Sequence, residues 1–187
     1  MGGGMRVLGV DPGSSATGFG LIERDGAELR HLRHGVLRPP SGVELSLRLR
    51  FLYRGLLEIL EQDKPEVAVV ERVFMASNPR SALVLGQARG ALLASLGMAG
   101  VRVLELSARE VKKSVTGTGA ADKKQMQAMV TRLLGLEAAP PIDAADALAL
   151  ALTYDQSGPL AEMSLRRPAR GRPHRKAMTQ HLLGRTQ

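Results

Sequence analysis

The sequence predicts an α/β domain built on a mixed five-stranded sheet flanked by helices. Two observations predict it. Three strand candidates follow one another at the start of the chain, and helix-like and strand-like segments alternate after them. Strands joined by tight turns are antiparallel, whereas strands separated by a helix are parallel, so the combination indicates a sheet of both kinds.

The first three strands are expected from short apolar or alternating runs bounded by turn-forming residues. They cover residues 6–10, 17–22 and 29–37. The segment 11–14, Asp-Pro-Gly-Ser, separates the first two, and Asp25-Gly26 between the second and third is a strong hairpin signal. We therefore expect a three-stranded meander.

The rest of the domain is expected from the spacing of its apolar residues. Leucine or isoleucine recurs at steps of three and four over residues 45–59, which predicts an amphipathic helix. The continuous apolar run at 67–71 is typical of a buried parallel strand. The same reasoning predicts a helix with Ser81 as its N-cap, a further strand, a helix that begins at Ser107, a glycine-rich loop and two more helices, over residues 81–98, 101–106, 107–114, 115–121, 122–134 and 142–154.

Composition limits the classes of protein that this chain can form. Its 187 residues suit one domain, and the absence of cysteine excludes disulfides and thiolate zinc sites. No apolar run has the length of a membrane span, and the N-terminus lacks a signal-like segment. We expect a protein without membrane association, located in the cytoplasm.

Positive charge is concentrated at the C-terminus. The chain carries a net charge of +8, and residues 155–187 hold seven of the 26 Lys and Arg residues but two of the 18 acidic ones. We expect a flexible lead over residues 1–5, a folded domain over 6–157 and a basic, disordered tail over 158–187. The tail is either an arm that seeks phosphates or a solubilising segment.

Four acidic residues stand out by their positions. Asp11 and Glu71 each end an apolar strand, and Asp143 and Asp146 share one face of the last predicted helix. If the first and fourth strands are neighbours, both strand acids emerge at one sheet edge, where α/β proteins bind ligands. Each acid also has a simpler interpretation, since Asp11 can open a turn and acids early in a helix complement its dipole.

Together, the four acids predict a metal centre. Carboxylates that converge without matching Lys or Arg repel one another, and divalent cations such as Mg²⁺, which prefer oxygen ligands, remove that repulsion. Two such ions can promote phosphodiester hydrolysis. The chain offers no cysteine nucleophile, and its four histidines show no H-E-x-x-H or triad pattern.

Several segments resemble the RuvC family of junction resolvases. They are residues 9–14, 17–20, 70–78, 81–90, 109–113 and 143–149, and the resemblance extends from Arg6 to Thr153. It implies a ribonuclease H-like fold and a Mg²⁺ or Mn²⁺ site ligated by the four acids above. It also implies a homodimer that nicks opposed strands of a four-way (Holliday) DNA junction and works with the RuvA–RuvB branch-migration complex. The helix over 81–98 would lie at the dimer interface; the alternative for its small residues is packing on the sheet.

Positions near the predicted site also raise candidates for DNA contact, and the resemblance favours Phe74, Lys112 and Lys123 among them. Lys112 and Lys123 are expected near the scissile phosphate, and Phe74 either stacks on bases or closes its loop as a core residue. Weaker candidates, each with an ordinary surface role as the alternative, are Asn78, Arg80, Lys113 and Lys124.

Two other functions compete with the nuclease. One is a junction-binding protein without catalysis, which would leave the cost of burying the acids without a purpose. The other is a phosphotransferase of actin or sugar-kinase architecture, which uses a similar Asp-x-Gly turn but usually needs a second, repeated domain that this chain is too short to hold.

Overall fold

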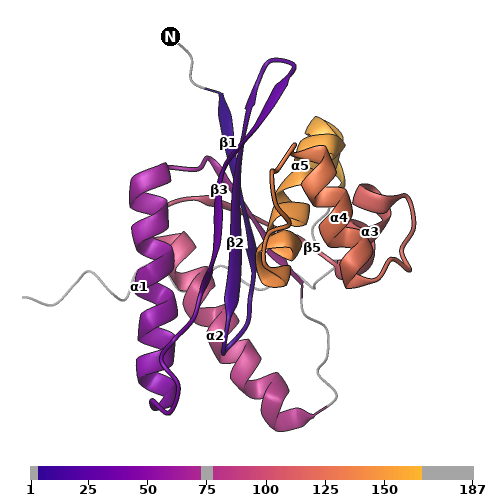
Figure 1. The fold of residues 1–187 in the computed structure, drawn as a ribbon. Helices are drawn as coiled ribbons and strands as arrows, with labels where there is room; N and C mark the ends of the chain where they lie inside the picture. Colours follow the sequence, from indigo (N-terminus) through magenta and orange to yellow (C-terminus); the bar gives the residue numbers. More distant parts are fainter. Residues whose placement is uncertain (1–3, 73–77, 166–187) are drawn as a thin grey trace, which may run out of the picture.

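The structure is a computed structural model that describes residues 4–72 and 78–165, with side chains up to residue 157. Figure 1 shows its elements in the colours of the sequence. In chain order they are β1 (Met5–Asp11), β2 (Thr17–Asp25), β3 (Glu28–Leu37), α1 (Leu45–Asp63), β4 (Val67–Glu71), α2 (Pro79–Met98), β5 (Arg102–Leu106), α3 (Ala108–Thr116), α4 (Lys123–Leu133) and α5 (Ile142–Leu165).

The five strands form one mixed sheet, as predicted. Their order is β3-β2-β1-β4-β5, with β1–β2 and β2–β3 antiparallel and β1–β4 and β4–β5 parallel. The tight turns join the antiparallel strands, and helices make the crossovers to β4 and β5. Because β1 lies beside β4, with Val10 paired to Val70, the two strand-terminal acids lie next to each other.

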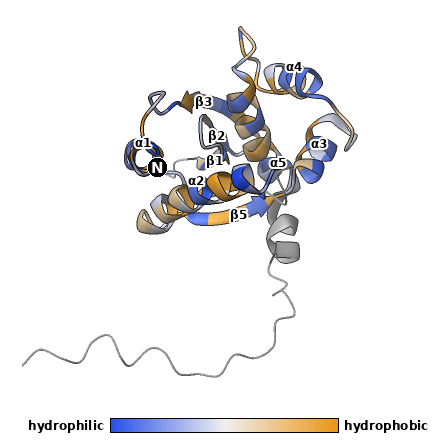
Figure 2. Ribbon diagram, turned by 90° about the horizontal axis from the view of Figure 1, so that it is seen from below, coloured by the Kyte–Doolittle hydropathy of each residue, from blue (hydrophilic) through white to orange (hydrophobic). Residues whose placement is uncertain are grey.

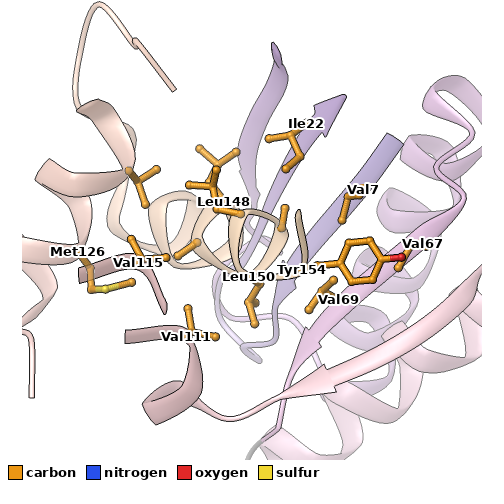
Figure 3. Close-up of a cluster of buried hydrophobic side chains, with 14 of the residues drawn as sticks. Val7, Ile22, Val67, Val69, Val111, Val115, Met126, Leu148, Leu150 and Tyr154 are labelled. Carbon is orange, nitrogen blue, oxygen red and sulfur yellow. The ribbon is translucent and has the colours of Figure 1, made fainter. Parts of the chain in front are cut away.

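Helices cover both faces of the sheet. Helices α1 and α2 lie on one face and α3, α4 and α5 on the other (Figures 1 and 2). Alternate strand residues therefore enter two separate cores. Val7 and Val69 pack with α3–α5, as Figure 3 shows, whereas Leu8 and Val70 pack with α1 and α2.

Helix α5 is the central helix of the second face. Its segment 144–152 is almost fully buried apart from Asp146, which agrees with the apolar run in the sequence. The helix continues to Leu165, past the domain boundary that we expected after residue 157. Periodicity alone could not place that end, because the last turns contain glycine and proline, which usually stop a helix.

Two helix starts test the capping predictions. The capping box of Ser107 and Glu110 begins α3 as expected. The prediction of Ser81 as the cap of α2 is wrong, because the Asn78 side chain accepts a hydrogen bond from Arg80 N (2.8 Å) and Pro79 occupies the first turn. Asparagine caps as well as serine, and proline suits the first helical position.

No helix in the described part of the chain is long and apolar enough to cross a membrane.

Candidate metal centre

The strand alternation aims two acids at the same side of the sheet. On β1 and β4, Val7 and Val69 face α5, so Asp11 and Glu71, an even number of residues further on, face α5 as well. The two acids are the last residues of adjacent parallel strands. They therefore stand side by side at the carboxyl edge of the sheet, where the loops leave room for a ligand.

The beginning of α5 brings the other two acids to this edge. Asp143 and Asp146 lie in its first turns, three residues apart and therefore on one face, and both are half-buried. The helix can come this close because the strands beneath it carry glycine. A Cβ atom on Gly9 would lie 1.7 Å from Ala147 O, and one on Gly18 would lie 1.8 Å from Asp143 O.

A cavity of about 230 Å³ opens between these elements. Its polar lining consists of the carboxylates of Asp11, Glu71 and Asp146 and the ammonium groups of Lys112 and Lys123. Its remaining lining is apolar and comes from α3, α4 and α5: Ala108, Val111, Met126 and Leu150. Acids and lysines from five separate elements, β1, β4, α3, α4 and α5, thus meet in one small, partly apolar pocket.

The electrostatics of the pocket are dominated by negative charge. Burial raises the pKa of Asp11 to about 8, and the charge of Glu71, a hydrogen bond with Glu71 and the charges of Asp146 and Asp143 add to that rise. Burial also raises the pKa of Asp146, while Lys123 opposes that rise. These directions identify a site that lacks positive charge for its acids.

Two cationic side chains partly neutralise this excess of negative charge. Lys123 Nζ lies 3.7 Å from Asp146 Oδ2, and an Arg38 guanidinium nitrogen lies 3.5 Å from Asp143 Oδ2. Both cations are largely exposed to solvent, so each pair is weak. No ion pair to Asp11 or Glu71 exists among the residues that the structure describes.

The donor set fits a hard divalent cation. All four acids offer carboxylate oxygens, the ligands that Mg²⁺ and Mn²⁺ prefer. Within residues 4–72 and 78–165, however, no three acidic or histidine side chains are close enough together to form a ready ligand group. A bound cation would turn the repulsion among these carboxylates into attraction. The chemistry of the residues therefore suits a divalent cation, although their spacing in this structure does not form a complete ligand group.

The other expected site residues lie at various distances from this cavity. Lys113 and Lys124 are exposed and do not line it, and Arg80 is exposed at the start of α2. The side chain of Asn78 caps α2, as described above. Phe74 lies outside the described residues.

Two arginines that were not among the predicted site residues form hydrogen bonds to the segments that carry Asp11 and Glu71. Arg48 of α1 donates to Ser14 O (2.6 Å) and Ser15 Oγ (3.2 Å), which ties down the loop after Asp11. Arg89 of α2 donates to Glu71 O (3.4 Å) and pairs with Glu105 of β5. Arg89 lies inside a segment that carried the family resemblance, so that segment was the available signal, whereas nothing in the sequence singled out Arg48.

The fold and the site together define a class. A five-stranded mixed sheet in this order, flanked by helices, is a ribonuclease H-like fold, and the acids of β1, β4 and α5 lie at one edge of it.

Comparison with known proteins identifies the family. The family model described as "Crossover junction endodeoxyribonuclease RuvC" matches residues 7–154. A crossover junction endodeoxyribonuclease RuvC from Tolumonas auensis is 50% identical over 151 residues, which cover 81% of this chain and 87% of that one. The protein of that name from Hyphomonas neptunium is 47% identical, over 83% of this chain and 93% of its own. The chain belongs to the RuvC family.

Solved structures agree. RuvC from Thermus thermophilus, solved in complex with a Holliday junction substrate, matches with a TM-score of 0.77 and 34% identity, over 86% of this chain and 97% of that chain. The yeast mitochondrial Holliday junction resolvase Ydc2 is 17% identical with a TM-score of 0.61, which shows a shared fold alone. Nucleases of the RuvC family are metal-dependent.

Proposed function

We propose that this chain is a structure-selective endonuclease that resolves four-way (Holliday) DNA junctions by paired nicks, in homologous recombination and DNA repair. Its family membership supports this, since relatives up to 50% identical are named crossover junction endodeoxyribonucleases. The T. thermophilus relative was solved with a junction bound, and this chain covers 97% of it.

The single observation that carries the proposal is the composition of the cavity at the sheet edge. Three carboxylates and two lysines face one another in it, and Asp143 begins the helix that forms its wall. Carboxylates for a cation and ammonium groups for a phosphate are the two parts that phosphodiester hydrolysis needs. The same lining contains no serine, threonine or cysteine nucleophile and no histidine base.

Asp11, Glu71, Asp143 and Asp146 would hold two Mg²⁺ ions, with Mn²⁺ as an alternative. When bound, such ions activate a water molecule and stabilise the oxygen that leaves the phosphorus. The chain itself orients the reactants. Lys112 and Lys123 place positive charge against the phosphate, and the apolar wall keeps bulk water away from the bond that breaks.

Cutting two opposed strands of one junction requires two such sites, so we propose a homodimer. The exposed face of α2 supports a dimer interface at this helix. Leu83 is 64% exposed there, and a Cβ atom on Gly86 or Gly90 would meet nothing within 4 Å. An exposed leucine beside small residues lets a second helix approach closely, and a two-fold dimer would use the same face twice.

Other expectations follow from the family alone. We propose that the enzyme works with the RuvA–RuvB branch-migration complex in the cytoplasm. Neither rival function gains support from the site, because three of the four acids line the pocket, Asp143 begins the helix beside it, and the family match covers nearly all of the folded chain.

A cleavage assay tests the proposal. The full chain is incubated with a labelled synthetic four-way junction, or with linear duplex of the same sequence, in Mg²⁺ or in EDTA. We expect paired nicks in the junction with Mg²⁺ and none in the duplex or in EDTA. Equal cutting of duplex, or cutting in EDTA, would contradict it. Thermal stabilisation by ATP in place of cleavage would favour the phosphotransferase.

A further inference from the structure

A second and larger hollow lies away from the metal centre, between α1 and the edge of the sheet at β3. It is an open groove of about 670 Å³ and shares no lining residue with the active-site cavity. Residues of α1 that line it recur at helical spacing from Leu47 to Gln62, so one continuous stripe of that helix faces the groove. Over that distance the helix extends by about 22 Å.

The groove is apolar at its base. Phe19, Leu37 and Ile59 line it, and α1 approaches β3 so closely that a Cβ atom on Gly55 would lie 3.0 Å from a Leu37 methyl carbon. Near its opening, Leu47 and Phe51 remain 49% and 40% exposed. Large apolar side chains that gather in one exposed hollow are typical of a binding surface rather than of an ordinary solvated helix face.

Its rim is positively charged. Arg50 and Arg54 are exposed on α1, and neither has a hydrogen-bond or ion-pair partner within the described part of the chain. Arg33 forms the opposite wall, where its guanidinium lies 5.5 Å from the ring centre of Phe19 and pairs with Asp63. Three arginines thus face the groove, against the single acid Glu58.

The charge and the position of the groove argue against α2, the C-terminal segment, a second copy of the chain and DNA as its occupant. Helix α2 packs on a different side of α1, where Ser95 Oγ donates to Tyr53 O (3.0 Å). The arginine-rich C-terminal segment would meet charge of its own sign. A second copy that packed this same groove against itself about a two-fold axis would bring the groove arginines of both copies together. A DNA backbone would use the arginines but would leave the apolar base of the groove without a partner, because contacts to the backbone are made chiefly to phosphate and sugar oxygens.

We propose that this groove docks an acidic segment of a partner protein, one that carries leucine or aromatic side chains between its carboxylates. The apolar side chains would cover Leu47 and Phe51, and the carboxylates would pair with Arg50 and Arg54. An extended segment of about six or seven residues matches the length of the stripe. The proposal concerns a surface separate from the metal centre and does not depend on the nuclease activity.

Fluorescence anisotropy with labelled peptides tests this on the full chain. The probes are a panel of eight-residue peptides in which Asp or Glu alternates with Leu or Phe. Two control panels carry Lys in place of the acids, or Ser in place of the apolar residues. We expect the acidic–apolar peptides to bind with a Kd on the order of 100 μM, between the millimolar and micromolar range of affinities. The control panels should bind at least about tenfold more weakly.

Variants locate the binding. Arg54→Glu and Phe51→Ser should each weaken binding of the acidic–apolar peptides about tenfold. The first removes a partner for the peptide carboxylates, and the second removes an apolar contact. Arg132→Glu, the same charge change at an exposed position of α4, serves as the matched control and should leave binding unchanged. Junction cleavage should persist in all three variants.

Three results would overturn the proposal. They are no binding by any acidic–apolar peptide, equal binding by the lysine panel, and equal weakening by Arg132→Glu. A loss of junction affinity in Arg54→Glu without peptide binding would instead assign the groove to DNA.

Discussion

A Cβ atom on Gly18 would lie 1.8 Å from the carbonyl oxygen of Asp143 and 2.3 Å from its carbonyl carbon. The second strand and the last helix thus touch backbone to backbone at the residue that begins the acidic pair. The position of Asp143 beside β1 depends on the absence of a side chain at residue 18.

Gly18→Ala should therefore damage the stability and the site together. The new methyl group has no flexible neighbour to displace, so α5 or β2 must shift, at a cost of about 1–3 kcal/mol. For a chain of this size, that lowers the melting temperature by about 2–4 °C per kcal/mol. Cleavage should fall even at temperatures at which the variant is still folded.

Gly97→Ala is the matched control. A Cβ atom there would meet nothing within 4 Å, so the change should be neutral or stabilise the helix by about 0.5–1 kcal/mol. Wild-type melting and cleavage in Gly18→Ala would show that α5 does not need this close contact.

Asp143→Asn should separate binding from catalysis. The amide keeps the size of the carboxylate but loses its charge, so junction binding should stay within about twofold while cleavage falls by more than about 100-fold. Loss of a residue that merely supports a metal ligand already costs about 10–100-fold, and loss of a ligand should cost more. The measurement is single-turnover cleavage beside a gel-shift titration. A variant that cuts at a near-normal rate would remove Asp143 from the metal centre.

The pKa of Asp11 predicts how the stability of metal-free protein depends on pH. The folded-state pKa is about 8 against an ordinary value of 3.8, so the folded state holds this proton more tightly than the unfolded state. Stability from that proton is complete below about pH 3.8 and is lost as the pH rises to about 8, by up to about 1.4 kcal/mol per pH unit.

Asp11→Asn should remove the loss of stability that ionisation of Asp11 causes at higher pH. In EDTA, its melting temperature should exceed that of the wild type by a margin that grows from pH 5 to about pH 8 and is constant above it. Mg²⁺ should stabilise the wild type more at pH 8.5 than at pH 6, and should do little for the variant. A margin that stays the same across this range would mean that Asp11 is ionised in the metal-free fold at every pH tested.

Phe74→Ala tests the stacking role predicted from the sequence. Loss of one base–aromatic contact costs about 1–3 kcal/mol, so junction affinity or the cleavage rate should fall about tenfold or more. The Mg²⁺ concentration that gives half-maximal cleavage should not change. Phe51→Ala, which alters an exposed phenylalanine of the α1 groove, is the control and should cut like the wild type. Unaltered cleavage in Phe74→Ala would favour a core role for this residue.

Much of the fold could be predicted because its signals are local. The short apolar runs of β1 and β4 and the steps of three and four along α1 depend only on neighbouring residues, and they predict the element types that the structure has. Helix ends depend on more than local spacing. Asn78 and Ser81 are both good caps, and the choice between them depends on how Pro79 enters the helix.

The sequence by itself determined which residues supply the chemistry: acids at the ends of two apolar strands, and a spaced pair at the start of a buried helix. Tertiary structure decided how close they come. Gly9 and Gly18 let α5 lie on the sheet, and Arg48 and Arg89 brace the loop after Asp11 and the end of β4. These contacts join segments far apart in the chain, so they depend on packing, and no local pattern of residues encodes them.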